Sequence, residues 1–238
     1  MRSSPTSPSP AKSVRQLLAE TAWVQALPTS VRERVLLDTH EQTFRAGDLV
    51  AHRGEPASSW IGVADGLLKI SAVHRSGKVV MFTGVPEGSW IGEGSVLKRE
   101  PRRYDILAVR PSRILHLPGS TMRWLLDTCI EFNHLIIARL NERLGQYIGM
   151  VEIDRLGDPV ARVARAIGTL YNPLLYPHMN ALLSLSQSEL GELIGMSRHS
   201  IAAALKQLES EGLISTEYGG VLIRKLSALV AYQERDAG

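Results

Sequence analysis

Apolar residues change their spacing along the 238-residue chain, and each spacing predicts a different kind of element. Residues 1–12 are rich in Ser and Pro and predict a disordered tail. The first helix is expected over residues 13–26, with an apolar side formed by Val14, Leu17, Leu18 and Val24. A second short helix is expected after Pro28, where Ser30 and Glu33 have the spacing of a capping box.

Residues 41–117 consist of short β-branched or alternating runs that are separated by glycine turns. The segment "RSGK", between Val73 and Val79, has the composition of a hairpin turn. Turn signals recur at the interval that is typical of an antiparallel sandwich or roll, so we expect that architecture here.

From Ser120 to about Arg155 the pattern predicts one long helix. Its apolar residues recur every three or four positions, close to the coiled-coil period. Such a stripe packs either on the chain's own β-domain or on a second copy of the chain, and its length favours a homodimer interface. The predicted interface consists of Cys129, Phe132, Ile136, Leu140, Leu144, Tyr147 and Val151.

The segment "LGDP" at 156–159 interrupts this helix, with Asp158 as an N-cap and Pro159 as the first helical residue. We therefore expect a β-rich domain with N-terminal helices over residues 13–119. A central helix and hinge would span 120–157, and a C-terminal domain 158–238.

The C-terminal domain has the pattern of a winged helix-turn-helix. Ser186 and Glu189 predict a capping box, Gly195 ends that short helix, and Ser197 caps the next one. "LISTEYGGVLIRKL" then predicts two strands around a Gly-Gly turn. The inward face of the second helix would consist of Ile201, Ala204, Leu205 and Leu208.

A second helix that begins with Arg198 and His199 suits an anionic partner better than a protein core. Arg198 can reach guanine in the major groove, and a helix N-terminus attracts phosphate. The alternative is an ordinary helical hairpin with solvated charges. The expected DNA contacts are Ser186, Ser188, Ser197, Arg198, His199, Ser200, Ala202, Lys206 and Arg224.

Composition narrows the class of protein but does not decide it. The net charge is +3, and acidic residues slightly outnumber basic ones in residues 158–238, so a DNA surface there must come from local clustering. Cys129 is the only cysteine, which excludes a disulfide framework and an all-cysteine metal site. No run of about 18 apolar residues predicts a membrane span, and a cytoplasmic setting is the simplest expectation. The sequence contains no Walker lysine, H-E-x-x-H or G-x-S-x-G motif, so we do not expect an enzyme.

The order of these parts resembles the Crp/Fnr family of bacterial transcription regulators, over about residues 30–230. "SQSELGELIGMSRHSIAAALKQLESEGLI" is similar to the family's DNA-binding signature, and "GSWIGEGSVLKREPRRYDILA" to its phosphate-binding cassette. The resemblance implies an α+β fold with a cyclic-nucleotide-binding-like antiparallel β-roll, a long dimerisation helix and a C-terminal winged helix-turn-helix. It also implies a homodimer on a palindromic operator in double-stranded DNA, with RNA polymerase as a further partner if the protein is an activator.

The cassette suggests where a ligand would bind between the β-roll and the central helix. Gly92 and Gly94 permit close backbone approach, Glu93 can accept a hydrogen bond from a ribose hydroxyl, and Arg103 can pair with a phosphate. The alternative is that the two arginines are solvated loop charges. The expected ligand-binding residues are Gly92, Glu93, Gly94, Arg102, Arg103, Tyr104 and Tyr147.

Two departures argue against cyclic AMP itself. Tyr104 stands where cyclic-AMP receptors of the family carry a small hydroxyl residue, and Tyr147 and Ile148 replace a Thr-Ser pair. The ligand is then another anionic cyclic mono- or dinucleotide, or the regulator works without one and is controlled by its abundance. A cyclic-nucleotide-binding module that does not act on DNA is the remaining alternative. No metal is expected, because the histidines are scattered at His52, His74, His116 and His134.

Overall fold

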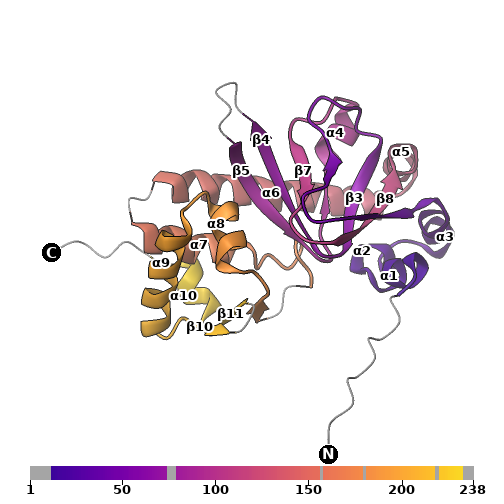
Figure 1. Ribbon diagram of the computed structural model, residues 1–238. Helices are drawn as coiled ribbons and strands as arrows, with labels where there is room; N and C mark the ends of the chain where they lie inside the picture. The colour runs from indigo at the N-terminus through magenta and orange to yellow at the C-terminus, as the bar shows by residue number, and fades with distance from the viewer. Residues whose placement is uncertain (1–11, 74–78, 156–157, 179–180, 218–219, 233–238) are drawn as a thin grey trace, which may run out of the picture.

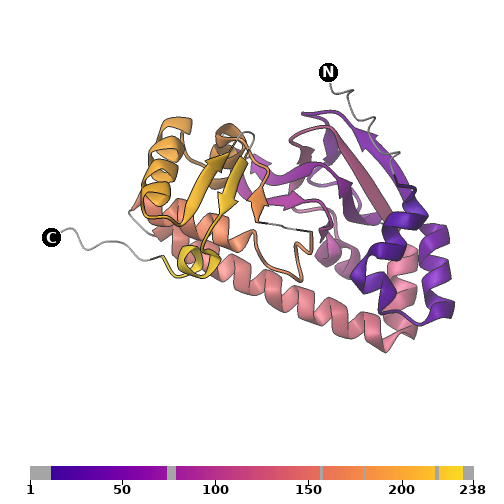
Figure 2. The same ribbon diagram turned by 90° about the horizontal axis from the view of Figure 1, so that it is seen from below.

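The computed structural model describes residues 12–73, 79–155, 158–178, 181–217 and 220–232. It has a β-rich N-terminal lobe and a mainly helical C-terminal lobe (Figure 1). The long helix α6 (Ile130–Arg155) runs beneath both lobes and connects them, as the view from below shows (Figure 2).

The chain begins with three short helices, α1 (Val14–Glu20), α2 (Ala22–Gln25) and α3 (Thr29–Asp38). The first predicted helix is interrupted at Thr21, which is extended and whose hydroxyl donates to the Leu17 carbonyl. The capping box expected at Ser30 is wrong, because α3 already starts at Thr29 and Ser30 lies inside its first turn. A capping box forms instead between Ser13 and Gln16, at the start of α1.

In the described part of the N-terminal lobe, the strands form two four-stranded antiparallel sheets, ordered β1-β8-β3-β6 and β2-β7-β4-β5. The predicted antiparallel β-roll is confirmed. The expected "RSGK" turn lies outside the described residues, but the flanking strands pair with Val73 opposite Val79. The elements are β1 (His40–Phe44), β2 (Leu49–Ala51), β3 (Ser59–Asp65), β4 (Leu67–Val73), β5 (Val79–Pro86), β6 (Trp90–Ile91), α4 (Glu93–Lys98), β7 (Asp105–Ala108) and β8 (Ser112–Pro118).

Four aromatic side chains form the centre of the core between the first sheet, the N-terminal helices and α6. The rings of Trp60 and Trp90 are 4.7 Å apart, and Trp23 lies 5.1 Å from Trp60. Phe132 of α6 completes the group at 5.9 Å from Trp60. Because Trp60 and Phe132 are fully buried, this cluster fixes α6 against the β-roll.

The single long helix expected from Ser120 is two helices, α5 (Gly119–Thr128) and α6. The break is at Cys129, whose backbone is extended. Asn133 stabilises the break, because its side-chain amide donates to the carbonyl groups of both Leu126 and Cys129, one on each side of the interruption.

In the C-terminal lobe, the helix α7 begins where the capping residues of the sequence predict. Asp158 caps α7 by accepting from the Val160 amide (2.8 Å), and Pro159 is the first helical residue, as predicted. The wing contains an additional strand that pairs with β11 and was not predicted, because it is only two residues long. The elements are α7 (Pro159–Thr169), β9 (Leu182–Leu183), α8 (Gln187–Ile194), α9 (Arg198–Ser210), β10 (Ile214–Glu217), β11 (Gly220–Ile223) and α10 (Leu226–Val230). Among the described residues, no helix is both long and apolar enough to cross a bilayer.

Replacing Trp60 with Ala should destabilise the protein by about 3–5 kcal/mol, because the cavity would open where three aromatic rings now meet. Trp124 is a matched control: it is only half-buried and lies under Arg34, 4.1 Å from ring centroid to guanidinium carbon. Trp124→Ala should cost clearly less in urea unfolding. An equal loss in both variants would contradict a core centred on Trp60.

A second prediction concerns His116, which is buried in β8 with Nδ1 3.0 Å from the Ser59 hydroxyl. Burial, together with repulsion from His40 and Arg102, lowers the pKa of His116 from 6.5 to about 4. Unfolding therefore takes up a proton between these values, and the stability present above pH 6.5 is lost as the pH falls towards 4.

When the pH is lowered from 7 to 5, the unfolding free energy of the wild type should fall by about 2 kcal/mol more than that of His116→Gln. The variant has no titrating group at position 116. Urea unfolding at both pH values measures this. Parallel pH profiles for the two proteins would show that His116 is not held in its neutral form.

Candidate functional site

The local geometry of α8 and α9 is that of a helix-turn-helix. Ser186 accepts from the Glu189 amide (3.2 Å) while the Glu189 carboxylate accepts from the Ser186 amide (2.7 Å), which confirms the capping box. Gly195 ends α8 in the left-handed conformation, with φ of 71°. Ser197 caps α9 by accepting from the Ser200 amide (3.1 Å). The short turn between the helices is thus fixed by these side chains.

Helix α9 has one buried and one exposed face. The predicted inward residues Ile201, Ala204, Leu205 and Leu208 are buried, and they hold α9 on the rest of the lobe. The exposed face lies on the side of the lobe that is remote from the β-roll (Figure 1). It presents Arg198, His199, Ala203 and Lys206.

The basic side chains of this face make no internal polar contacts among the described residues. Within the described part of the chain, Arg198, His199 and Lys206 make no side-chain hydrogen bond or ion pair. Arg198 and His199 belong to the first turn of α9, where the helix dipole adds positive potential. The arrangement can therefore bind an anionic polymer without first breaking internal contacts.

The remaining residues predicted to contact DNA lie at several places around α8, α9 and the wing. Ser186, Ser188 and Ser197 are exposed, and Arg224 is exposed directly after β11. Ser200 and Ala202 are half-buried, so they offer less surface than Arg198. The Gly-Gly turn of the wing includes Gly219, which lies outside the described residues.

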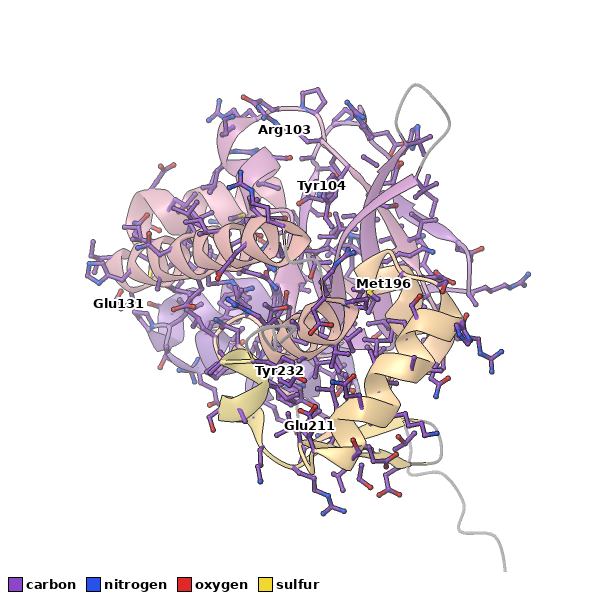
Figure 3. All side chains as sticks on the ribbon, turned by 90° about the vertical axis from the view of Figure 1, so that its left-hand side faces the viewer. Arg103, Tyr104, Glu131, Met196, Glu211 and Tyr232 are labelled. Atoms are coloured by element: carbon purple, nitrogen blue, oxygen red, sulfur yellow. The ribbon has the colours of Figure 1, made fainter. Side chains whose placement is uncertain are left out.

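The cassette of the β-roll places its arginines differently from the sequence prediction. Arg103 is solvent-exposed and pairs with Glu100 (2.8 Å), and it projects from the outer edge of the molecule (Figure 3). Arg102 is buried and donates to the Ser59 carbonyl (2.8 Å). The chain bends at Arg103 and Tyr104 before it enters β7, with Arg103 exposed and Tyr104 half-buried. The expected contact of Arg103 with a ligand beside Glu93 is not preformed.

Of the cassette glycines, Gly92 has a definite structural role. It starts α4 with φ of 86°, a conformation that side chains disfavour, and a Cβ there would approach the Arg102 guanidinium. A Cβ at Gly94 would meet open space instead. Glu93, the next residue after Gly92, is directed into the protein and is buried.

Glu93 belongs to a buried polar cluster that the sequence analysis missed. We call it the sensor pocket and define it by Glu93 of α4, Arg139, Arg143 and Gln146 of α6, and Tyr176 from the loop after α7. Arg143 Nε lies 4.0 Å from Glu93 Oε1. Arg139 and Arg143 both donate to the Trp90 carbonyl, at 2.8 and 3.3 Å. A usable signal did exist, because both arginines continue the inward spacing of Phe132 and Ile136.

The sensor pocket carries a positive excess. Burial lowers the pKa of Arg139 to about 10, so this guanidinium stays charged at neutral pH. Two guanidinium groups thus face one carboxylate, and within the described structure Glu93 Oε2 and Arg139 Nε have no hydrogen-bond partner. Such an excess of buried positive charge favours an additional anionic group.

Tyr104 and Tyr147 lie beside the sensor pocket. Burial raises the pKa of both phenols, and in each case the Glu93 carboxylate raises it further. Both therefore remain protonated hydrogen-bond donors at neutral pH. The structure thus gathers Glu93, Tyr104 and Tyr147 from the predicted ligand site and leaves Arg103 outside it. In the described residues, no group of three His, Cys, Asp or Glu side chains could hold a metal ion.

The residues of the predicted dimer interface do not all lie on one face: some are buried against the chain's own core, and others are exposed on α6. Cys129, Phe132 and Ile136 are buried in the chain's own aromatic core, which corrects their assignment to a surface between two copies. Tyr147 is half-buried towards Arg143. The exposed apolar positions form a separate strip, which we call the outer stripe: Ile137, Leu140, Leu144, Ile148 and Val151.

Two family models match the chain in different regions. The cyclic nucleotide-binding domain matches residues 41–129, which contain the β-roll and the cassette. The Crp-like helix-turn-helix domain matches residues 161–232, which contain α8, α9 and the wing. A comparison with curated protein sequences gave no match.

Several solved structures share the fold over most of their length. FixK2 from Bradyrhizobium japonicum is 15% identical with a TM-score of 0.68, covering 84% of this chain and 99% of its own. The c-di-GMP responsive global regulator CLP from Xanthomonas campestris is 20% identical with a TM-score of 0.58, covering 82% and 99%. A CRP/FNR-family transcriptional regulator from Thermus thermophilus is 23% identical with a TM-score of 0.56, covering 82% and 100%. At these identities the likeness shows the fold.

The two domain matches lie in the order that the β-roll and the winged helix have along the chain. The solved structures share this arrangement of the fold over 82–84% of the chain. The chain belongs to the Crp/Fnr family of DNA-binding transcription regulators.

Proposed function

We propose that this regulator acts as a homodimer that reads a palindromic operator with α9 and responds to a small anionic ligand of the cyclic mono- or dinucleotide class. The observation that carries the DNA part is the unengaged cationic first turn of α9, with Arg198 and His199 exposed at the positive end of the helix.

Each exposed residue of α9 suits a different feature of the major groove. Arg198 can donate two hydrogen bonds to guanine O6 and N7, and His199 can donate to guanine N7 or to a phosphate. Ala202 and Ala203 offer apolar contact to thymine methyl groups. Lys206 and Arg224 supply charge for phosphates, and the serines at the starts of the two helices, Ser186, Ser188, Ser197 and Ser200, can hydrogen-bond to the backbone.

The outer stripe supports dimerisation. Its members recur every three or four residues along α6, and Leu144 and Ile148 are 58% and 63% exposed in the single chain. A stripe of that length on a solvent-facing helix is stabilised when a second copy of the helix covers it. Two copies related by a two-fold axis would then present two α9 helices to one operator.

The sensor pocket and the comparisons support ligand sensing. The pocket lies between the β-roll and α6 and has a positive excess, as an anionic ligand requires. The related CLP is described as c-di-GMP responsive. Tyr104 and Tyr147 replace the small polar residues of cyclic-AMP receptors, so we propose a ligand other than cyclic AMP.

The DNA assignment predicts one strongly required guanine in each half-site, with the half-site centres about 34 Å apart. Arg198→Ala should remove the preference at that base pair, at a cost of about 1–3 kcal/mol per half-site. Lys206→Ala should instead weaken binding to all sequences and reduce its salt dependence. Selection from a randomised site measures both effects.

Arg45→Ala is the matched control, because it removes one exposed arginine from the β1–β2 turn, in the other lobe. It should leave both affinity and base preference unchanged. If Arg198→Ala returns the same base preferences as the parent, Arg198 does not read a base.

The dimer assignment predicts that Leu140→Glu/Leu144→Glu sediments as a monomer, because four carboxylates would face one another in an apolar seam. Leu37 offers a matched control, since it is 73% exposed on α3. Leu37→Glu should remain dimeric. A dimer that survives the double substitution would exclude the outer stripe as the interface.

A further inference from the structure

We infer that Tyr176 is an internal ligand of the sensor pocket. Its phenol occupies the position of an anionic ligand that carries a planar ring, and such a ligand binds by expelling Tyr176 and releasing the loop that leads into the helix-turn-helix. The inference rests on the ligand-sensing part of the proposed function and names how that site is regulated.

Tyr176 is held as a ligand would be held. It is 1% exposed, although it belongs to a loop between α7 and β9. Its hydroxyl oxygen accepts from Gln146 Nε2 (2.6 Å) and from Arg143 Nη1 (3.1 Å), and it lies 3.5 Å from the Thr83 hydroxyl. The Arg143 guanidinium also lies 5.8 Å from the centre of the ring. The contacts come from the β-roll and from α6 together.

Residues 172–175 of the loop are fitted to the same helix. Arg139 Nη1 donates to the Leu174 carbonyl (2.8 Å), and Asn172 donates to the Glu142 carboxylate (2.6 Å). The Asn172 side chain also accepts from the amides of Leu174 and Leu175, which closes a tight turn. Residues 172–175 therefore lie against α6 in one defined conformation, and Arg139 contacts both this part of the loop and the β-roll.

The groups that Tyr176 leaves unmatched define the class of ligand. A neutral phenol does not balance the second guanidinium of Arg139 and Arg143, whereas a phosphate would. Glu93 Oε2 has no partner within the described residues and can accept from a hydroxyl. The volume of the phenol suits a planar ring. Anion, hydroxyl and ring together are the features of a nucleoside phosphate.

Expelling Tyr176 would loosen the contact between the two lobes. The helix-turn-helix rests on the β-roll through the ion pairs Lys69–Glu192 (2.6 Å) and Arg110–Glu189 (3.0 Å) and through Leu193, which lies against Gly84. These ion pairs are partly exposed, and such pairs stabilise little on their own. Tyr176 is a buried anchor of the docked arrangement, in addition to Leu67 of β4, which packs in the core of the C-terminal lobe.

An internal ligand competes with any external one. The apparent affinity for a ligand falls in proportion to the fraction of molecules in which the pocket is open. Removing the Tyr176 side chain should therefore tighten the binding of an anion even when the other residues of the pocket are unchanged. This consequence holds for inorganic pyrophosphate as well as for a nucleotide, so it does not depend on the identity of the natural ligand.

Calorimetric titration of the full-length protein with inorganic pyrophosphate and, separately, with cyclic di-GMP tests the inference. Tyr176→Ala should bind pyrophosphate roughly tenfold or more tightly than the wild type. Tyr176→Phe keeps the ring and loses the hydroxyl contacts, and it should gain about fivefold. Arg143→Gln in either background should remove the gain. If Tyr176→Ala fails to fold, the pyrophosphate affinity of Tyr176→Phe tests the inference by itself.

Tyr171→Phe is the matched control. Tyr171 begins the same loop, and within the described residues its hydroxyl has no hydrogen-bond partner. Its loss should leave pyrophosphate binding unchanged. Hydrogen exchange should also become faster in α8 for Tyr176→Ala and not for Tyr171→Phe, because only the first variant loses the anchor.

Unchanged pyrophosphate binding in both folded Tyr176 variants would overturn the inference. Cyclic di-GMP that binds Tyr176→Ala more tightly than pyrophosphate does would support the ring as part of the ligand, and weaker binding would restrict the inference to an inorganic or smaller anion. Retardation of operator DNA by the wild type is measured separately. Its absence would overturn the proposed function while leaving the pyrophosphate result to decide the role of Tyr176.

Discussion

Two buried guanidinium groups converge on one carbonyl oxygen, that of Trp90, and the arrangement of the lobes depends on this contact. A buried charge is stable only where it is hydrogen-bonded, so Arg139 and Arg143 restrict α6 to the position in which they reach Trp90. The indole of the same residue packs in the aromatic core, and the same arginines bind the loop at Leu174 and Tyr176. One contact thereby joins the β-roll, the central helix and the approach to the DNA-binding domain.

Helix α6 has two chemically distinct faces. Its inward face is apolar near Phe132 and Ile136 and becomes cationic over the next two turns, at Arg139 and Arg143. Its outer stripe stays apolar to Val151. A change of side chains in the sensor pocket would therefore move a helix whose other face is available to a second copy. In the proposed function, ligand response and dimerisation would therefore depend on one rigid element.

The sequence predicts well what short-range chemistry decides. Asp158, Ser186, Gly195 and Ser197 each act on backbone groups within a few residues, and all four have the roles that their spacing indicates. Two kinds of feature were missed. The helix break at Cys129 depends on Asn133, a polar residue that the spacing of apolar residues does not take into account. The sensor pocket depends on residues from α4, α6 and a distant loop, and no local rule brings Tyr176 to Arg143.

All four tryptophans, Trp23, Trp60, Trp90 and Trp124, precede the C-terminal domain in the sequence. Trp60 lies with its ring centre 5.6 Å from the Arg139 guanidinium, and Trp90 supplies the carbonyl that holds both arginines. A charge so close to an indole alters the energy of its excited state. The tryptophan fluorescence of the protein thus originates in the N-terminal lobe and is coupled to the electric field of the buried arginines, which gives the unlabelled protein an optical signal of its own.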